Sequence, residues 1–348
     1  MTQYHRLRVS ALIEETHDSK SVVFDVPPAL AAAFNYRPGQ FLTLRLPIDG
    51  KYVPRCYSMS SSPLLDAAPR VTVKRVNQGR GSNWICNQLK VGDELEVMPP
   101  SGVFSPKQLN QDFLLMAGGS GVTPVFSILR HVLEQASARI TLLYANRDER
   151  SVIFRDALNA LAKAHPQRLQ IVHWLDSVQG VPTVAQLTEF ARPHAASQAF
   201  ICGPGPFMDA AVEALNAIHM AEADIHVERF VSLPDEEALA AAQTARQNEA
   251  PRTDAVDEAQ IEISIDGQVH TLDCSGQETI LEAALRNKIS LPFSCQAGMC
   301  ASCMCQVVEG SVHLRHNDVL DAKDLAKSWT LACQAVPTST RIRLKFSE

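Results

Sequence analysis

Four cysteines at a defined spacing constrain this chain more than any other feature of its sequence. Cys295, Cys300 and Cys303 form the pattern C-x4-C-x2-C within SCQAGMCASCMC, and Cys333 follows in LACQA. This spacing is typical of a loop that ligates a [2Fe–2S] cluster, whose two irons need four thiolates converging from one side. Gly298 and the neighbouring alanines let backbone N–H groups approach the sulfurs. These four cysteines are therefore predicted to be iron ligands.

A zinc site is the alternative interpretation of the same thiols. Structural zinc usually takes two C-x2-C pairs, and the sequence has one such pair, Cys300 and Cys303. The spacing therefore favours iron and sulfide. Cys305, two positions further on, is interpreted as a core thiol on a strand that leaves the loop.

Length and composition narrow the class of protein. A chain of 348 residues predicts two or three domains. A net charge of −6 lacks the excess of basic residues that is typical of a nucleic-acid-binding protein. The start MTQYHRLRVSALIEE has no apolar signal region, and no apolar run is long enough to span a membrane. An odd count of nine cysteines without an export signal argues against a disulfide framework, so we expect a cytoplasmic protein.

Four regions follow from the hydrophobic pattern. Residues 1–107 alternate apolar and polar in short runs such as FLTLRLPIDG, which predicts an antiparallel β-barrel or sandwich. In residues 108–233, buried-strand runs such as ITLLYAN alternate with helical stretches, which predicts a parallel α/β sheet. Residues 234–258 contain almost no large apolar residues and are predicted to be a linker, with a short alanine-rich helix as the alternative. Residues 259–348 carry the cysteine loop.

Two stretches of the predicted barrel suit a flavin. In RCYS, Arg55 can neutralise a pyrophosphate, Tyr57 can pack on the isoalloxazine ring, and the Ser58 hydroxyl can reach a ring nitrogen. VKRVNQGRGSNWI then places Gly81 and Ser82 at a predicted helix start, where backbone N–H groups can hold phosphate. Taken alone, R-x-Y-S fits an ordinary strand with an exposed arginine equally well.

Two turns of the predicted α/β sheet suit a dinucleotide. MAGGSGVTP predicts a tight turn into a helix that begins near Thr123 and Pro124, with the threonine as cap and phosphate at the helix N-terminus. FICGPGPFMDA ends a later strand, where ligands bind in such folds. The alternative for this second stretch is a plain strand-to-helix turn with Cys202 as a core thiol.

In this order, R-x-Y-S, GGSGVTP and CGP-x-x-F resemble the ferredoxin–NADP reductase superfamily, and residues 259–348 resemble a plant-type ferredoxin. The resemblance implies an antiparallel β-barrel for flavin, an α/β parallel-sheet domain for nicotinamide, and a β-grasp ferredoxin domain. The candidate cofactor-binding residues are then Arg55, Tyr57, Ser58, Lys74, Gly81, Ser82, Gly119, Gly121, Thr123, Pro124, Arg147, Asp148, Cys202, Gly203, Phe207 and Phe230.

The identity of the nicotinamide donor depends on the stretch YANRDER. Asp148 can accept hydrogen bonds from a ribose 2′-hydroxyl, whereas Arg147 can pair with a 2′-phosphate. We favour NADH over NADPH, and FAD over FMN, although R-C-Y-S alone does not exclude FMN. Hydride transfer to a flavin needs no general base, so none of the eleven histidines is assigned a catalytic role.

Three sites of this kind in one chain predict an electron-transfer reductase. A nicotinamide delivers two electrons as a hydride and an iron–sulfur cluster accepts one, so a flavin belongs between them. The arrangement is similar to reductase components of bacterial oxygenases, most of all those of 3-ketosteroid 9α-hydroxylase and phenylacetyl-CoA epoxidase. We expect a monomer that feeds a Rieske-type or di-iron oxygenase degrading a steroid or aromatic compound. The alternatives are a separate ferredoxin or cytochrome as acceptor, and a cluster-based redox sensor.

Overall fold

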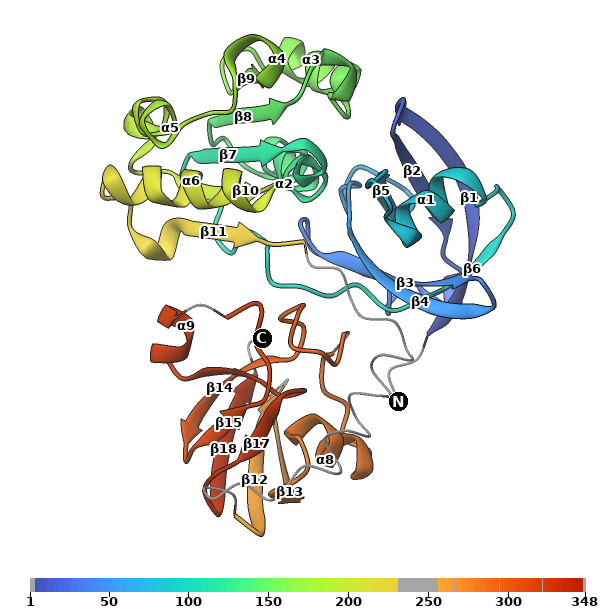
Figure 1. The fold of residues 1–348 in the computed structure, drawn as a ribbon, viewed down its shortest axis with the longest axis vertical. Coiled ribbons are helices and arrows are strands. Elements are labelled where there is room, and N and C mark those ends of the chain that lie inside the picture. Colours follow the sequence, from blue (N-terminus) through green and yellow to red (C-terminus); the bar gives the residue numbers. More distant parts are fainter. Residues whose placement is uncertain (1–3, 231–255, 266, 294, 321, 347–348) are drawn as a thin grey trace. The chain divides into compact units, whose positions relative to one another are not determined.

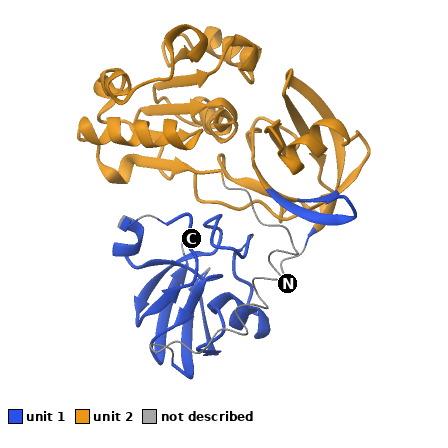
Figure 2. Ribbon diagram, viewed as in Figure 1, with its two compact units in different colours: residues 1–4, 45–55, 231–348 blue, residues 5–44, 56–230 orange. Residues whose placement is uncertain are grey.

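The computed structural model of the chain describes residues 4–230, 256–265, 267–293, 295–320 and 322–346 (Figure 1). They fall into two compact units (Figure 2). One unit consists of residues 5–44 and 56–230, and the other contains residues 45–55 and the C-terminal region. The linker predicted at residues 234–258 lies outside the described residues as far as residue 255.

The first sheet has six strands in the order β4-β3-β6-β1-β2-β5. Its β1–β2, β1–β6 and β2–β5 pairs are antiparallel, and Met59 bridges Val71 across the edge between the end of β4 and β5. Alternate residues such as Leu7 and Phe24 are fully buried, as a barrel interior requires. The elements are β1 (His5–Thr16), β2 (Ser19–Asp25), η1 (Pro28–Leu30), β3 (Phe41–Ile48), β4 (Lys51–Ser58), β5 (Arg70–Lys74), α1 (Arg80–Asn87) and β6 (Glu94–Val97).

The second sheet is parallel, with the strand order β11-β10-β7-β8-β9. Leu115 and Leu142 belong to a core with α2 and α3, whereas Leu114 and Leu143 belong to a core with α5 and α6. Both faces of the sheet are therefore covered, which explains the continuous apolar strands. The strands are β7 (Phe113–Gly118), β8 (Ile140–Asn146), β9 (Leu169–Leu175), β10 (Gln198–Cys202) and β11 (Ile225–Glu228). The helices are η2 (Gly119–Gly121), α2 (Val122–Gln135), η3 (Glu149–Ser151), α3 (Arg155–Ala164), α4 (Asp176–Gln179), α5 (Val184–Ala191), η4 (Arg192–His194), α6 (Gly205–Ala217) and η5 (Glu222–Asp224).

The C-terminal region forms a mixed sheet in the order β13-β12-β18-β14-β16, with β12 and β18 parallel. Helix α8 starts at a capping box, in which Thr279 and Glu282 satisfy each other's backbone N–H groups. Buried residues of α8 share one core with this sheet, which is the β-grasp arrangement expected. The elements are β12 (Glu258–Ile265), β13 (Gln268–Ser275), α8 (Ile280–Arg286), β14 (Met304–Glu309), β15 (Val312–Leu314), α9 (Ala322–Ala326), β16 (Trp329–Leu331), β17 (Ala335–Pro337) and β18 (Arg341–Phe346).

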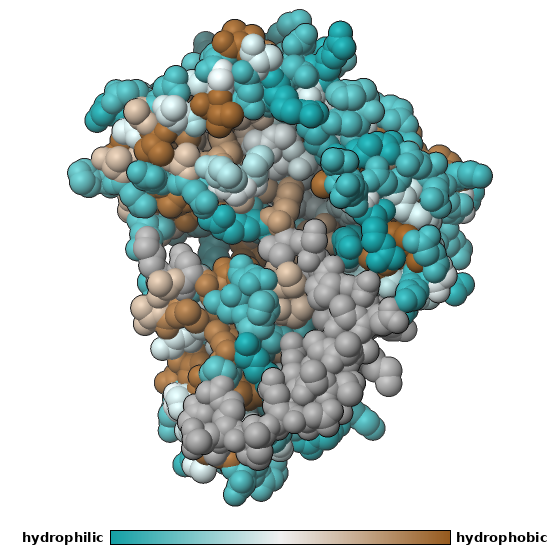
Figure 3. Space-filling view, in the orientation of Figure 1, coloured by the Kyte–Doolittle hydropathy of each residue, from teal (hydrophilic) through white to brown (hydrophobic). Residues whose placement is uncertain are grey.

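The surface is mainly polar. Figure 3 shows hydrophobic residues gathered on the α9 and β14 side of the C-terminal unit, where Leu325 and Val308 are exposed. Among the residues that the structure describes, no helix has the length and apolar character needed to cross a membrane.

Candidate functional site

The four predicted cysteine ligands come together in the C-terminal unit. Hydrogen bonds link their sulfurs in the order Cys300, Cys295, Cys333, Cys303. All but Cys300 are buried. The structure thus brings Cys333 to the loop between α8 and β14, although it is distant in sequence.

Backbone N–H groups surround these sulfurs. The N–H groups of Ala297 and Met299 donate to Cys295 Sγ at 3.4 and 3.3 Å, and that of Cys295 donates to Cys300 Sγ at 3.4 Å. The Gly298 N–H donates to Cys333. Donors of this kind stabilise iron-bound thiolates and tune the cluster potential. The loop therefore has the donor chemistry that a [2Fe–2S] cluster needs.

The loop reaches this shape through left-handed backbone conformations. Gln296, Gly298 and Ala301 have φ angles of 53°, 74° and 52°. At Gly298 an added Cβ would lie only 2.6 Å from the carbonyl oxygen of His316. Glycine is required there for both its conformation and its close contact.

The geometry separates a two-iron cluster from a single metal ion. Within the described part of the chain, no three or more His, Cys, Asp or Glu side chains converge to hold one ion. The sulfurs instead follow one another in a hydrogen-bonded row, and its two end pairs, Cys295 with Cys300 and Cys303 with Cys333, suit one pair on each iron. A tetrahedral zinc site would need all four around one point.

The raised pKa values of Cys295, Cys300 and Cys333 mean that these thiols retain their protons strongly in the absence of a metal. Hydrogen bonding with Cys300 lowers the pKa of Cys295, while hydrogen bonding with Cys333 and burial raise it, to a net value of about 12. Metal binding must displace those protons, so ligation is coupled to thiol ionisation. Cys305 is fully buried in the core of this unit, as expected of a core thiol.

The R-C-Y-S stretch forms the end of β4. The Arg55 Nη1 atom donates to the carbonyl oxygen of Pro54 at 2.7 Å. Strand alternation places Arg55 and Tyr57 on one face of β4, and both are partly exposed. Ser58, on the other face, is only 4% exposed. A guanidinium and an aromatic ring on the same strand face fit the phosphate and ring of a flavin nucleotide.

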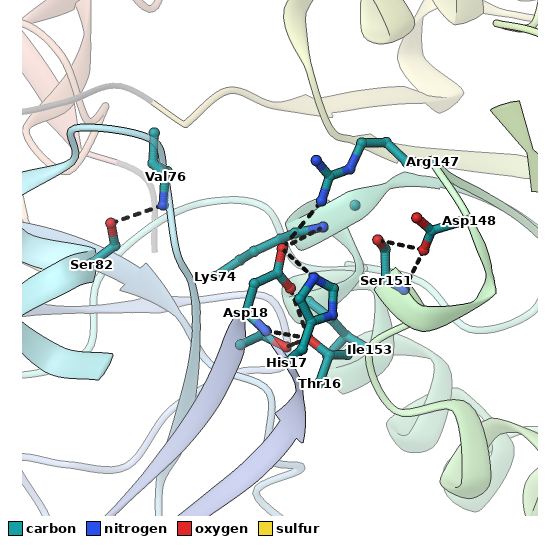
Figure 4. Close-up of polar contacts among 12 residues, drawn as sticks. Thr16, His17, Asp18, Lys74, Val76, Ser82, Arg147, Asp148, Ser151 and Ile153 are labelled. Carbon is teal, nitrogen blue, oxygen red and sulfur yellow. Dashed lines mark hydrogen bonds and ion pairs between the residues drawn. The ribbon is translucent and has the colours of Figure 1, made fainter. Parts of the chain in front are cut away.

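Helix α1 begins where the sequence predicts a phosphate-binding helix start. Gly79 is its N-cap, and no side chain caps the helix. The Ser82 hydroxyl accepts from the Val76 N–H at 3.1 Å and lies 3.4 Å from the Gly79 carbonyl oxygen, so it braces this turn (Figure 4). Gly81 is buried beside it. The first turn of α1 is therefore available to an anionic group.

The glycine-rich turn after β7 packs backbone to backbone against the turn after β10. An added Cβ at Gly121 would lie 2.1 Å from the Cys202 carbonyl oxygen, and one at Gly203 would lie 2.9 Å from Gly118. Gly119 differs, because an added Cβ there would meet only Lys74 Nζ, at 3.8 Å. Gly121 and Gly203 thus serve close packing, while Gly119 presents an open backbone.

The capping role predicted for Thr123 is wrong. Helix α2 begins at Val122 with Gly121 as N-cap, so Thr123 is inside the helix and does not cap it. Its hydroxyl donates instead to the Ser120 carbonyl oxygen at 3.0 Å. Pro124 occupies the first turn as predicted, and both residues are buried.

Cys202 and Glu228 lie side by side at the ends of β10 and β11. Burial, and then the Glu228 charge, raises the pKa of the Cys202 thiol. Burial also raises the pKa of the Glu228 carboxyl to about 8, although part of this residue's surface remains exposed. Phe207 lies on α6 and is buried in the core between this helix and the sheet, whereas Phe230 is 47% exposed.

Arg147 and Asp148, the two residues of YANRDER that bear on the choice between NADH and NADPH, both interact with other side chains of the protein. Asp148 accepts hydrogen bonds from the N–H and Oγ of Ser151, at 3.0 and 2.9 Å, and so caps η3 (Figure 4). Arg147 Nη2 lies 3.4 Å from Asp18 Oδ2. Lys74 Nζ lies 3.9 Å from the same oxygen, and burial lowers the pKa of Lys74.

Sequence reasoning missed two residues here. Asn146 is 4% exposed, and its buried amide has no hydrogen-bond partner among the described residues other than the neighbouring Tyr144 hydroxyl. Its position at the carboxyl end of a buried strand was an available signal for a ligand-binding amide. Asp18 had no local signal, because it meets Arg147 from 129 positions away.

Comparison with known proteins agrees with this geometry. The oxidoreductase FAD-binding domain family matches residues 6–105, the oxidoreductase NAD-binding domain family matches residues 115–213, and the 2Fe-2S iron-sulfur cluster binding domain family matches residues 263–338. The chain therefore contains FAD-, NAD- and [2Fe–2S]-binding domains, as the sequence predicts.

Whole-length relatives define the family. The chain is 49% identical over 341 residues to the ferredoxin reductase component of 3-ketosteroid-9-alpha-monooxygenase from Rhodococcus rhodochrous, covering 98% of this chain and 96% of that protein. It is 35% identical over 371 residues to a component of the 1,2-phenylacetyl-CoA epoxidase from Escherichia coli, covering 99% and 98%. The solved structure of phthalate dioxygenase reductase shares the fold over 99% of this chain and 98% of that one, with a TM-score of 0.59 and 23% identity. The chain belongs to this family of reductase components and is an oxidoreductase, as the resemblance implies.

Cys300→Ser is expected to remove or damage the cluster and leave flavin binding intact, because Cys300 lies in the part of the chain that matches the 2Fe-2S family, and the FAD-binding family matches residues 6–105. Iron content should fall from about two atoms per chain, while flavin content stays at the wild-type value. Cys305→Ala, a core thiol of the same unit, is the control and should retain iron. Full iron content in Cys300→Ser would exclude this residue as a ligand.

Glu228→Gln is expected to stabilise the protein at high pH only. The pKa of Glu228 rises from 4.5 to about 8 on folding, so its ionisation costs stability increasingly as pH rises between these values. The variant's unfolding temperature should match the wild type near pH 4.5 and exceed it at pH 9, by an amount that solvent screening reduces. Glu213→Gln, at an exposed position of α6, serves as control. An equal effect at both pH values would contradict the assignment.

Proposed function

We propose that this chain is the reductase component of an oxygenase that acts on a steroid or an aromatic compound. It would take electrons from NADH and pass them through FAD and the [2Fe–2S] cluster to a Rieske-type or di-iron oxygenase. The observation that carries this proposal is the similarity to a steroid monooxygenase reductase over nearly the whole length of both chains.

The flavin site is assigned to β4 and α1. FAD, when bound, accepts a hydride from nicotinamide and releases the two electrons singly to an iron–sulfur acceptor. Arg55 would pair with the pyrophosphate and Tyr57 would pack on the ring system. The Ser58 side chain, buried on the opposite face of β4, does not fit the predicted contact with a ring nitrogen. Gly81 and Ser82, in the first turn of α1, would offer backbone N–H groups to phosphate.

The nicotinamide site is assigned to the carboxyl ends of β7, β8 and β10. The open backbone of Gly119 and the Lys74 ammonium would bind phosphate, and the buried Asn146 amide would bind the nucleotide's polar edge. Gly121, with Thr123, Pro124, Gly203 and Phe207, would hold the two turns in place, and Phe230 would lie against the flavin side. The pKa of about 8 at Glu228 keeps its carboxyl largely protonated at neutral pH, and the Cys202 thiol beside it also stays neutral. Two neutral groups would thus meet the electron-rich donor ring.

The cluster site is assigned to Cys295, Cys300, Cys303 and Cys333. Three of these residues are buried, and Cys300 is partly exposed. The Cys300 side would therefore be the edge through which an electron leaves towards a protein acceptor.

The domain boundaries, the oligomeric state and the cellular location belong to the same proposal. Residues 1–107, 108–233 and 259–348 would be separate domains, joined by a linker at residues 234–258. The protein would act as a monomer in the cytoplasm, in keeping with nine cysteines that form no disulfide.

Reconstitution with candidate oxygenases tests the proposal. Purified oxygenase components for a 3-ketosteroid and for an aromatic acyl-CoA should be supplied with NADH and this protein, and product should be measured. We expect product with one of the two oxygenases. The rate of NADH oxidation with that oxygenase should be well above the rate with a free ferredoxin or cytochrome as acceptor. NADH-driven reduction of ferredoxin or cytochrome with neither oxygenase active would contradict the oxygenase assignment.

Arg55→Ala is expected to weaken FAD retention, because the pyrophosphate would lose a charged bidentate partner worth about 2–3 kcal/mol. The FAD-to-protein ratio after gel filtration should fall well below that of the wild type. Arg139→Ala, which removes an exposed arginine paired with Asp112, is the matched control. An unchanged ratio in Arg55→Ala would remove this residue from the flavin site.

A further inference from the structure

A single carboxylate oxygen faces three basic side chains at the edge of the proposed nicotinamide site. Asp18 Oδ2 lies 3.4 Å from Arg147 Nη2 and 3.9 Å from both Lys74 Nζ and His17 Nε2 (Figure 4). Asp18 lies in the turn between β1 and β2, Lys74 ends β5, and Arg147 follows β8. The barrel therefore supplies a negative charge to a cation of the α/β sheet.

The position of this carboxylate is set by its own turn and does not depend on the cations. The Thr16 hydroxyl donates to Asp18 Oδ1 at 2.8 Å and accepts from the Asp18 N–H at 3.2 Å. Ser19 Oγ lies 2.6 Å from the same hydroxyl. The Asp18 side chain is only 14% exposed. With Oδ1 held in this way, Oδ2 is directed at the basic side chains.

Arg147 is the most exposed of the basic side chains in this cluster. Its side chain is 67% exposed, and its distance from Asp18 is longer than in a good charge-assisted hydrogen bond. Its backbone is anchored, because the Ser177 N–H donates to the Arg147 carbonyl oxygen at 2.8 Å. The guanidinium can thus turn towards a phosphate, but only within reach of the fixed Asp18 charge.

We propose that Asp18 is a specificity-determining residue that makes this reductase select NADH over NADPH. The inference rests on the proposed nicotinamide site at β7 and β8. Arg147 is the cation that would pair with a 2′-phosphate, and Asp18 already neutralises it. A 2′-phosphate placed at Arg147 also meets the fixed carboxylate, and like charges at close range oppose binding. NADH has a ribose 2′-hydroxyl at that position and avoids this repulsion.

Binding of two redox-inactive nucleotides tests the proposal without electron transfer. Calorimetric titrations of the FAD- and cluster-containing protein should compare 2′,5′-ADP with 5′-ADP. Asp18→Asn keeps the Oδ1 acceptor of the turn and removes the charge. The variant should bind 2′,5′-ADP roughly tenfold more tightly than the wild type does, and this gain should clearly exceed any gain for 5′-ADP through the neighbouring Lys74. The NADPH-to-NADH ratio of kcat/KM, measured with ferricyanide, should rise in parallel.

Two further variants keep the test specific. Asp112→Asn removes a carboxylate paired with Arg139 elsewhere in the same unit, and should leave both affinities unchanged. Arg147→Ala should cancel the gain in the Asp18→Asn background, because the released guanidinium is its source.

Failure of the Asp18 proposal and failure of the nicotinamide site would give different results. Weaker binding of both nucleotides by Asp18→Asn would mean that Asp18 positions Lys74 and Arg147, and would overturn the proposal. An unchanged preference between the two nucleotides would overturn it as well. A wild-type protein that binds neither 5′-ADP nor NADH would instead refute the nicotinamide site itself.

Discussion

Backbone contact between the turns after β7 and β10 is the constraint on which the nucleotide half of this protein depends. Gly121 approaches the Cys202 carbonyl so closely that no side chain fits between them. This contact aligns the carboxyl ends of the parallel strands, where ligands bind in such sheets. It also leaves Gly119 open beside Lys74 and keeps the Cys202 thiol buried next to Glu228. One close packing contact therefore fixes the two turns to which the nicotinamide site is assigned in the proposal.

A different constraint shapes the C-terminal unit. The cysteine loop contains two non-glycine residues, Gln296 and Ala301, in left-handed conformations that each cost about 1–2 kcal/mol. Those conformations direct backbone N–H groups at the sulfurs, an arrangement of use only when the sulfurs carry negative charge. Iron binding would offset the strain through thiolate–metal bonds, so the local fold and the cluster are coupled.

Much of this architecture could be predicted from sequence because its signals are local. The run ITLLYAN is mainly apolar, is buried throughout and becomes β8, and the cysteine spacing alone identifies the loop. The misassigned cap at Thr123 shows the limit, since the helix starts one residue earlier on a glycine turn. Contacts between residues that are far apart in the sequence are harder to predict. The Asp18–Arg147 contact joins the first sheet to the second within one unit, and no periodicity or spacing in either sheet predicts it.

The central claim is that one chain carries electrons from a nicotinamide through a flavin to an iron–sulfur cluster. Anaerobic titration of the purified protein with NADH, followed by visible absorbance, tests it most directly. The account predicts that flavin bands and the broad iron–sulfur absorbance bleach together, within the stoichiometry of added NADH, and that NADPH is the poorer donor. Flavin that bleaches while the iron–sulfur absorbance stays oxidised would show that the two sites are not connected.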